Sequence, residues 1–263
     1  MSQMRTAHMR VETSAATHVG KVRERNEDSY LVRPETGIWA VADGMGGHEA
    51  GDLASQTVIE ALASIETSDS ASELLALCKG RIFDANSRLM KISSERGVVI
   101  GTTVTILLTF DGYFACVWAG DSRMYVVRDG GISQISRDHT EAEDLLADGV
   151  ITAEEAQSWA GKNVITRAIG VTEFPELEVA TGTIQPGDIF VICTDGLTRH
   201  VPDEEILEST GASPPEQACD HLIRITLERG AGDNVTVVVV RFGAEHALAS
   251  ALQTDSSALR GGT

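Results

Sequence analysis

The sequence predicts an α+β sandwich in which helices pack outside antiparallel sheets. Three observations support this fold class: strand-like segments dominate, two consecutive helical segments interrupt them early, and one further helix precedes the last strand. The chain of 263 residues is 42% hydrophobic and 23% charged, which provides enough apolar surface for one folded domain. We expect that domain to span residues 17–242, with flexible ends at 1–16 and 243–263.

The first elements are two strands and two helices. Strands are predicted at 29–33 and 38–42, and the second is a run of small and apolar residues that ends at Asp43. In the segments 54–65 and 74–89, apolar residues recur at spacings of three and four, which marks one face of a helix in each. We therefore expect these two helices to lie side by side.

A series of strands follows the helices. Four are predicted, at 101–109, 113–119, 122–128 and 131–135. Asp111-Gly112 and Asp129-Gly130 connect them in pairs, and both dipeptides suit tight hairpin turns. This part of the chain is therefore expected to form antiparallel hairpins.

The second half of the chain begins with a break in the strand pattern. Residues 139–162 are acidic and helix-prone, and 152–155 carry a capping-box signature, so we interpret this stretch as a mobile flap outside the sheet. The remaining predicted elements are strands at 163–168, 177–183 and 188–193, a helix at 215–228 and a last strand at 234–241.

The composition narrows the classes of partner and compartment. A formal net charge of −18 argues against non-specific binding to nucleic acids or to anionic membrane surfaces. No export signal and no apolar stretch long enough to span a membrane is evident. The four cysteines lie far apart in apolar contexts without a metal-binding spacing, so we expect buried thiols, a reducing compartment and a cytoplasmic protein.

Aspartates next to glycine fall into two groups. Those in the predicted hairpins are explained by their turns. Asp43 and Asp195 instead follow apolar strands and precede segments that are not strand-like, while Asp121 and Asp233 also lie beside glycine at strand ends. Because a partly buried carboxylate is costly unless a cation or a hydrogen-bond donor satisfies it, these four predict a metal site.

The chemistry of these side chains predicts the kind of ion and reaction. Carboxylate oxygens without clustered His or Cys favour Mg²⁺ or Mn²⁺ over Zn²⁺ or copper. Two such ions about 3.5–4 Å apart can polarise a bridging water and clamp the oxygens of a phosphoryl group. Arg23, in the charged run 23–28, is the candidate for bidentate contact with phosphate, although such a run taken alone is more often a solvated loop.

Seven motifs occur in sequence between residues 17 and 242. They are Arg23-x-x-Asn26-Glu27-Asp28, Val41-Ala42-Asp43-Gly44-Met45-Gly46-Gly47-His48, Gly101-Thr102-Thr103, Ala119-Gly120-Asp121-Ser122-Arg123, Asp138-His139, Thr194-Asp195-Gly196-Leu197 and Gly232-Asp233-Asn234. In order and spacing they resemble the metal-dependent (type 2C) serine/threonine protein phosphatases. The resemblance implies a central β-sandwich of two antiparallel sheets flanked by helices, with a two-metal centre in the cleft at one end.

The resemblance also implies which residues hold the ions. Asp43 matches the ligand that bridges the two metals, and the carbonyl of Gly44 matches a ligand of one of them. Asp195 and Asp233 match ligands of the other metal. Asp121, together with Asp195, matches a third and weaker site.

Three further residues match supporting roles. Glu27 and Asp28 match acids that support the metals, largely through water, and Arg23 matches the phosphate-binding arginine. Residues 139–162 match the variable flap of the family, which implies an influence on substrate choice and turnover.

One position departs from many eukaryotic members. These have a histidine directly after Asp-Gly, proposed as the general acid, where this chain has Met45; His48 follows three residues later, in a form similar to the bacterial branch. The ordinary pKa of His48 suits protonation of the leaving oxygen, and a hydrogen bond to a metal-bound water is an equal alternative. His139 is expected to be structural, at the base of the flap.

The resemblance implies a protein phosphatase that removes phosphate from serine or threonine by direct attack of a metal-bridging water. It implies Mn²⁺ or Mg²⁺ as cofactor, a phosphorylated protein as substrate and an opposing Ser/Thr kinase, and we further expect a monomer. One alternative is a hydrolase of small phosphorylated metabolites. Another is a catalytically silent module of the same fold that binds and regulates a phosphoprotein, which the presence of all four aspartates disfavours.

Overall fold

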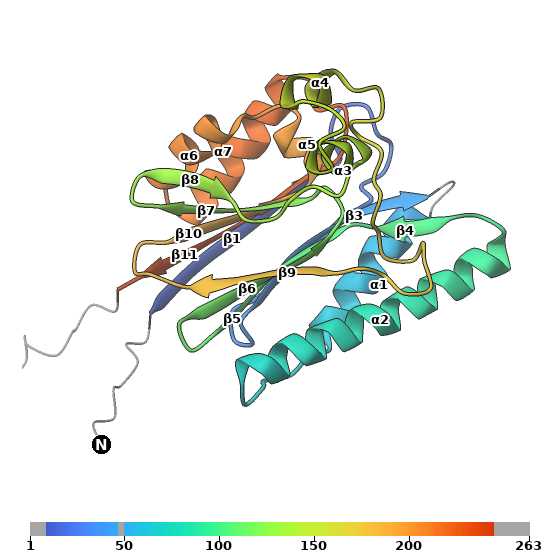
Figure 1. Cartoon of the computed structure of the whole chain (residues 1–263). Coiled ribbons are helices and arrows are strands. Elements are labelled where there is room, and N and C mark those ends of the chain that lie inside the picture. The colour runs from blue at the N-terminus through green and yellow to red at the C-terminus, as the bar shows by residue number, and fades with distance from the viewer. Residues whose placement is uncertain (1–8, 47–49, 245–263) are drawn as a thin grey trace, which may run out of the picture.

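The computed structural model describes residues 9–46 and 50–244, which form two antiparallel sheets packed face to face between layers of helices (Figure 1). The first sheet has the order β1-β11-β10-β7-β8, with strands β1 (Arg10–His18), β7 (Arg123–Arg128), β8 (Gly131–Gln134), β10 (Ile189–Cys193) and β11 (Val235–Gly243). The second has the order β2-β3-β5-β6-β9, with strands β2 (Asp28–Arg33), β3 (Ile38–Gly46), β5 (Val104–Phe110), β6 (Tyr113–Ala119) and β9 (Glu178–Thr183), and β4 (Ile100–Thr102) pairs with β3. The predicted α+β sandwich is confirmed.

Helices cover the outer face of each sheet. Figure 1 shows α1 (Gly51–Ala63) and α2 (Ala71–Arg96) against the second sheet, and α6 (Asp203–Gly211) and α7 (Pro215–Glu228) against the first. The two helices predicted at 54–65 and 74–89 are confirmed, and they pack side by side as expected.

Strand β10 shows how the central layers are built. Phe190 and Ile192 face the apolar core between the sheets, while Val191 and Cys193 belong to the core under α7. Because both faces of this strand are covered, its sequence is apolar throughout rather than alternating. All four cysteines of the chain are buried free thiols, as the sequence predicts.

The predicted hairpins are confirmed by their backbone angles. Asp111 and Gly112 connect β5 to β6 with φ values of 47° and 79°, and Asp129 and Gly130 connect β7 to β8 with 52° and 77°. Two consecutive residues of positive φ match the right-handed twist of the paired strands.

The segment 139–162 leaves the sheets and forms two short helices, α3 (Glu141–Ala147) and α4 (Ala153–Ser158), with the predicted capping box at Thr152 and Glu155. At its base, His139 is fully buried and stacks on Trp118 at 6.0 Å between ring centroids. The Nδ1 atom of His139 accepts a hydrogen bond from the Gly120 N–H at 3.1 Å. Burial lowers the pKa of His139, so the neutral ring fits this structural position.

Several predicted elements differ from the structure. Residues 10–16 are not a flexible end but lie in β1, which pairs with β11 along its whole length. The predicted strand at 163–168 is only an isolated bridge between Thr140 and Ile165. Two helices, α5 (Asp195–Thr198) and α6, were not predicted. The expected flexible segments 1–8 and 245–263 lie outside the described residues.

None of the helices in the described part of the chain combines the length and apolar content that crossing a membrane would require.

Candidate metal centre

The predicted site residues meet at one end of the sandwich, where strands of both sheets begin or end. Asp43 lies near the end of β3 and pairs in register with Asp28, the first residue of β2. In the other sheet, β10 ends two residues before Asp195, and β11 begins two residues after Asp233. Because β10 and β11 are antiparallel, these two aspartates are brought to the same end of the sheet.

Close backbone contacts fix the position of Gly44. Its N–H donates to the carbonyl oxygen of Glu27 at 3.1 Å. A Cβ atom on Gly44 would overlap the carbonyl oxygen of Gly51 and would approach that of Glu27 to 2.7 Å. Only glycine allows β3, the loop before β2 and the start of α1 to meet this closely.

The backbone of Asp43 is held by two threonines. The N–H of Asp43 donates to Oγ1 of Thr103 at 3.0 Å, and the Asp43 carbonyl accepts from the Thr103 N–H and from Oγ1 of Thr102, both at 2.9 Å. The Gly101-Thr102-Thr103 motif thus fixes the backbone position of Asp43, from which its side chain extends.

Asp28 is a buried carboxyl group that is only half satisfied. Its Oδ2 accepts hydrogen bonds from Oγ1 of Thr236 at 2.7 Å and from Oγ1 of Thr194 at 2.9 Å. Its Oδ1 is buried with no hydrogen-bond partner among the described residues. Burial raises the pKa of Asp28 to about 7, against the effect of both threonine bonds.

Two more carboxylates share this property. Oδ1 of Asp121 and Oδ1 of Asp195 are also buried, and neither has a hydrogen-bond partner in the parts of the chain that the structure describes. Burial, followed by the charge of Asp195, raises the pKa of Asp121 to about 7, and burial also raises the pKa of Asp195. The pKa of Asp43 is raised by burial and then by the surrounding carboxylates, Asp28 first.

This arrangement fits a divalent cation. A buried carboxylate oxygen without a partner is costly, and several negative charges close together add to the cost. A hard cation such as Mn²⁺ or Mg²⁺ would satisfy the unpaired oxygens and cancel the repulsion between them. The donor set is all oxygen, which matches the preference of these two ions.

Two arginines already occupy part of the cluster. Arg23 contacts both carboxylate oxygens of Asp233, with Nε 2.9 Å from Oδ1 and Nη2 3.0 Å from Oδ2. Arg199 contacts Oδ2 of Asp233 at 3.1 Å and is paired with Oδ2 of Asp195. Within residues 9–46 and 50–244, no three acidic, histidine or cysteine side chains form a ready-made cage. A cation at Asp195 or Asp233 would therefore exchange with a guanidinium group.

Asn234 fastens the loop before β2 to this site. Its Oδ1 accepts from the Glu27 N–H at 2.8 Å, and its Nδ2 donates to the carbonyls of Val19 and Arg25 at 2.8 and 2.9 Å. Arg23 and Glu27 are thereby held next to Asp233. Burial raises the pKa of Glu27, and the hydrogen bond from Gly51 opposes that rise.

A cavity of about 560 Å³ connects the acid cluster to the flap. Asp121, Asp195 and Arg199 line it on the side of the cluster, and Glu143 and Lys162 line it on the side of the flap. This cavity is large enough for a phosphorylated side chain and its neighbours.

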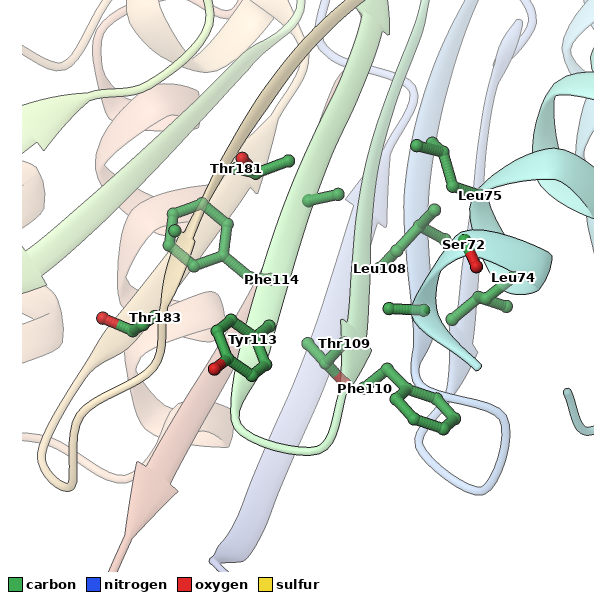
Figure 2. A pocket seen from close by; sticks show the side chains of 13 residues that line it. Ser72, Leu74, Leu75, Leu108, Thr109, Phe110, Tyr113, Phe114, Thr181 and Thr183 are labelled. Carbon is green, nitrogen blue, oxygen red and sulfur yellow. The ribbon is translucent and has the colours of Figure 1, made fainter. Parts of the chain in front are cut away.

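A second cavity, of about 440 Å³, lies at the opposite end of the second sheet, between the start of α2 and the strands β5, β6 and β9. Figure 2 shows Leu75, Leu108 and Phe114 on its walls, and none of the described residues that line it is acidic or basic. Its lining is mostly apolar, with the hydroxyl groups of Ser72, Tyr113 and three threonines.

All but one of the predicted site residues lie in this cluster. The exception is His48, which lies outside the described residues. The structure places the others together at one end of the sandwich: Arg23, Glu27, Asp28, Asp43, Gly44, Asp121, Asp195 and Asp233. Their roles as metal ligands or phosphate contacts stay predictions.

Sequence reasoning missed two residues of the site. Arg199 was not singled out, although its position four residues after Asp195 is the spacing of an ion pair on one face of a helix. Asn234 was part of a motif but was given no role. Its three hydrogen bonds reach residues more than 200 positions away, which no local pattern reveals.

Comparison with known proteins identifies the family. Residues 17–218 match the family described as protein phosphatase 2C. Over 228 residues the chain is 38% identical to the serine/threonine protein phosphatase PstP of Mycobacterium tuberculosis. This match covers 86% of the present chain but only 44% of the length of PstP. It is 31% identical over 247 residues to the protein phosphatase PhpP of Streptococcus pneumoniae, covering 90% of this chain and 100% of that one.

Comparison with solved structures points to the same family. A structure of PppA from Pseudomonas aeruginosa superposes with a TM-score of 0.83 at 37% identity, covering 88% of this chain and 97% of that one. The catalytic domain of PstP, in complex with two manganese ions, superposes with a TM-score of 0.81 at 35% identity, covering 90% and 100% of the two chains. The sandwich, the acid cluster and these matches agree, and the chain belongs to the protein phosphatase 2C family.

Proposed function

We propose that this chain is a metal-dependent protein phosphatase that hydrolyses phosphoserine and phosphothreonine. The single observation that carries the proposal is a set of three buried carboxylate oxygens, on Asp28, Asp121 and Asp195, that have no partner within the described residues. Family membership supports the reaction class, since the named relatives are serine/threonine phosphatases. The retained cluster argues against a silent binding module.

In this proposal, Asp43, the Gly44 carbonyl, Asp195 and Asp233 hold two divalent ions, and Asp121 with Asp195 holds a weaker third. When bound, such ions supply positive charge that activates a water and stabilises the phosphoryl oxygens. The two manganese ions in the PstP structure support Mn²⁺ as the cofactor, and Mg²⁺ has the same ligand preferences.

Glu27 and Asp28 are proposed to support this centre without being its main ligands. Asp28 is fixed by Thr194 and Thr236, and Glu27 is fixed by Asn234. Their carboxylates add negative charge beside the centre, which favours cations over neutral occupants.

Arg23 is proposed to bind the phosphate. Its side chain is half exposed and its fork of N–H donors suits two phosphoryl oxygens. During hydrolysis, a bond forms between the water oxygen and phosphorus, and the bond from phosphorus to the serine or threonine oxygen breaks. The attacking water gives up one proton and the departing oxygen takes one, and His48 remains our candidate donor to the departing oxygen.

The proposed partners are phosphorylated proteins and the Ser/Thr kinase that phosphorylates them. The cavity beside the flap has room for the residues around a phosphorylated side chain. The buried free thiols support a reducing compartment such as the cytoplasm. We further propose that the protein is a monomer.

The test is hydrolysis of a phosphothreonine peptide and of p-nitrophenyl phosphate, with Mn²⁺ or Mg²⁺ and after EDTA treatment. We expect metal-dependent activity on both compounds, and a loss of about 10³-fold in Asp43→Ala. Activity without divalent metal, or undiminished in Asp43→Ala, would contradict the metal centre. A preference for small phosphorylated metabolites over the peptide would replace the protein substrate with a metabolite.

A further inference from the structure

Arg199 is placed where it interferes with the proposed metal ligands. It directly follows α5, four residues after Asp195, so its side chain lies on the same side of this helical turn. One guanidinium nitrogen lies 3.1 Å from Oδ2 of Asp233, and another is paired with Oδ2 of Asp195. Arg199 is therefore bonded to two of the aspartates that are expected to hold a cation.

The surroundings of Arg199 differ from those of an ordinary surface ion pair. Its side chain is 39% exposed, but the side chains of Asp195 and Asp233 are only 11% and 21% exposed. The guanidinium thus reaches from solvent into an acidic cluster. In such partly buried surroundings, charges interact more strongly than in water.

Arg199 also has room to move away. It lines the cavity of about 560 Å³ between the cluster and the flap, so open space borders its long side chain. Because an arginine does not lose its proton in proteins, it can give up these carboxylates only by moving.

We propose that Arg199 is an internal counter-ion that competes with divalent cations for Asp195 and Asp233 and thereby weakens metal binding at this centre. Each carboxylate oxygen that accepts a guanidinium N–H is engaged when the cation arrives, and the two positive charges repel each other. The inference rests on the proposed metal centre. It adds that Arg199, which is not a ligand, lowers the metal affinity of this centre, in addition to Arg23, which also contacts Asp233.

Isothermal titration of Mn²⁺ into EDTA-dialysed protein tests this inference directly. We expect Arg199→Met to bind Mn²⁺ with a Kd about tenfold lower than the unmodified protein, since a competing charge close to the ligands is removed. Arg224→Met is the matched control. Arg224 pairs with Glu228 on α7 with the same spacing of four residues, at 2.7 Å, in the helix layer of the first sheet. Its Kd should stay within about twofold, because an exposed charge away from the site is screened.

The outcomes separate this inference from the proposed function. An unmodified protein that binds no Mn²⁺ would overturn both. An unmodified protein that binds Mn²⁺, with an Arg199→Met variant that binds no more tightly, would overturn the counter-ion role alone. Should Arg199→Met fail to fold, Arg199→Gln keeps hydrogen-bond donors without the charge and carries the same expectation of tighter binding.

Discussion

Strand β10 has a buried aspartate at each end, and the two are treated very differently. Asp188, directly before the strand, is 1% exposed and fully bonded: Arg128 contacts both of its oxygens, at 2.7 and 2.6 Å, and the Gln185 N–H donates to Oδ2 at 2.7 Å. Asp195, two residues past the strand, is 8% exposed, and its Oδ1 has no partner among the described residues. The first aspartate fastens a corner of the fold. The second is paired with Arg199 through Oδ2 but keeps Oδ1 buried and unpaired within the described residues, a costly arrangement that is typical of a functional site.

Exchanging each aspartate for its neutral amide tests this comparison most strongly. Asp195→Asn should reduce kcat/KM for the phosphothreonine peptide by about 10³-fold while the thermal midpoint stays level or rises, because repulsion is relieved. Asp188→Asn should lower the free energy of unfolding by about 3–5 kcal/mol, because it leaves Arg128 without its partner, and should leave activity per folded molecule unchanged. Thermal melts and peptide assays on both variants check this. Equal effects of the two substitutions on activity would remove the distinction.

A glycine at the site, Gly44, can be compared in the same way with a glycine away from it, Gly80. Gly44→Ala should fail to fold or lose more than about 3 kcal/mol, since its Cβ would overlap the Gly51 carbonyl. Gly80→Ala in α2 has nothing within 4 Å of the added atom and should gain up to about 1 kcal/mol from helix propensity. Thermal unfolding measures both. A Gly44→Ala variant as stable as the Gly80→Ala variant would mean that the strand can open locally.

Arginines at the two ends of β10 should also differ, Arg23 beside Asp233 in the acidic cluster and Arg128 beside Asp188. Arg23→Ala should raise KM for the phosphopeptide about tenfold with little change in thermal midpoint, since this side chain is half exposed and is proposed to bind substrate. Arg128→Ala should lower stability by about 3 kcal/mol and leave KM unchanged, because it leaves Asp188 buried and unpaired. Steady-state kinetics and melting curves distinguish them. An unchanged KM in Arg23→Ala would assign Arg23 to the loop structure alone.

The smallest expected effect is a dependence of stability on pH in metal-free protein. The pKa of Asp28 is about 7 in the folded state, above its ordinary value of 3.8, so the folded protein binds this proton more tightly than the unfolded chain does. Stability from this group is therefore greatest at low pH and is lost as pH rises from about 4 to about 7. The thermal midpoint of Asp28→Asn, relative to the unmodified protein, should increase across this range.

Asp129→Asn supplies the control for this pH series. Asp129 lies in a hairpin turn at a φ of 52°, a conformation that asparagine also tolerates. Its midpoint relative to the unmodified protein gives the baseline, at each pH, for replacing an exposed turn carboxyl by an amide. A difference for Asp28→Asn that follows this baseline would show that the Asp28 carboxyl stays ionised throughout.

Much of the fold and site could be predicted from sequence because the signals are local. Apolar strands that end in Asp-Gly, such as the one before Asp195, need no distant partner to be recognised. Strand β1 escaped prediction because its small and polar residues become a strand only by pairing with β11, more than 200 positions away. The ion pair of Arg199 with Asp233 has the same origin, since folding alone brings them together. The resemblance to a family supplied the roles that neither spacing nor composition could assign.

The central claim is that unpaired carboxylates at one end of β10 form a divalent-metal centre. The most direct measurement is the thermal midpoint of EDTA-treated protein with and without saturating Mn²⁺, in the unmodified chain, Asp43→Asn and Asp188→Asn. We predict that Mn²⁺ raises the midpoint by several degrees in the unmodified chain and in Asp188→Asn, and not in Asp43→Asn, since binding stabilises only a folded state that holds the ion. No shift in the unmodified chain, or an equal shift in Asp43→Asn, would contradict the account.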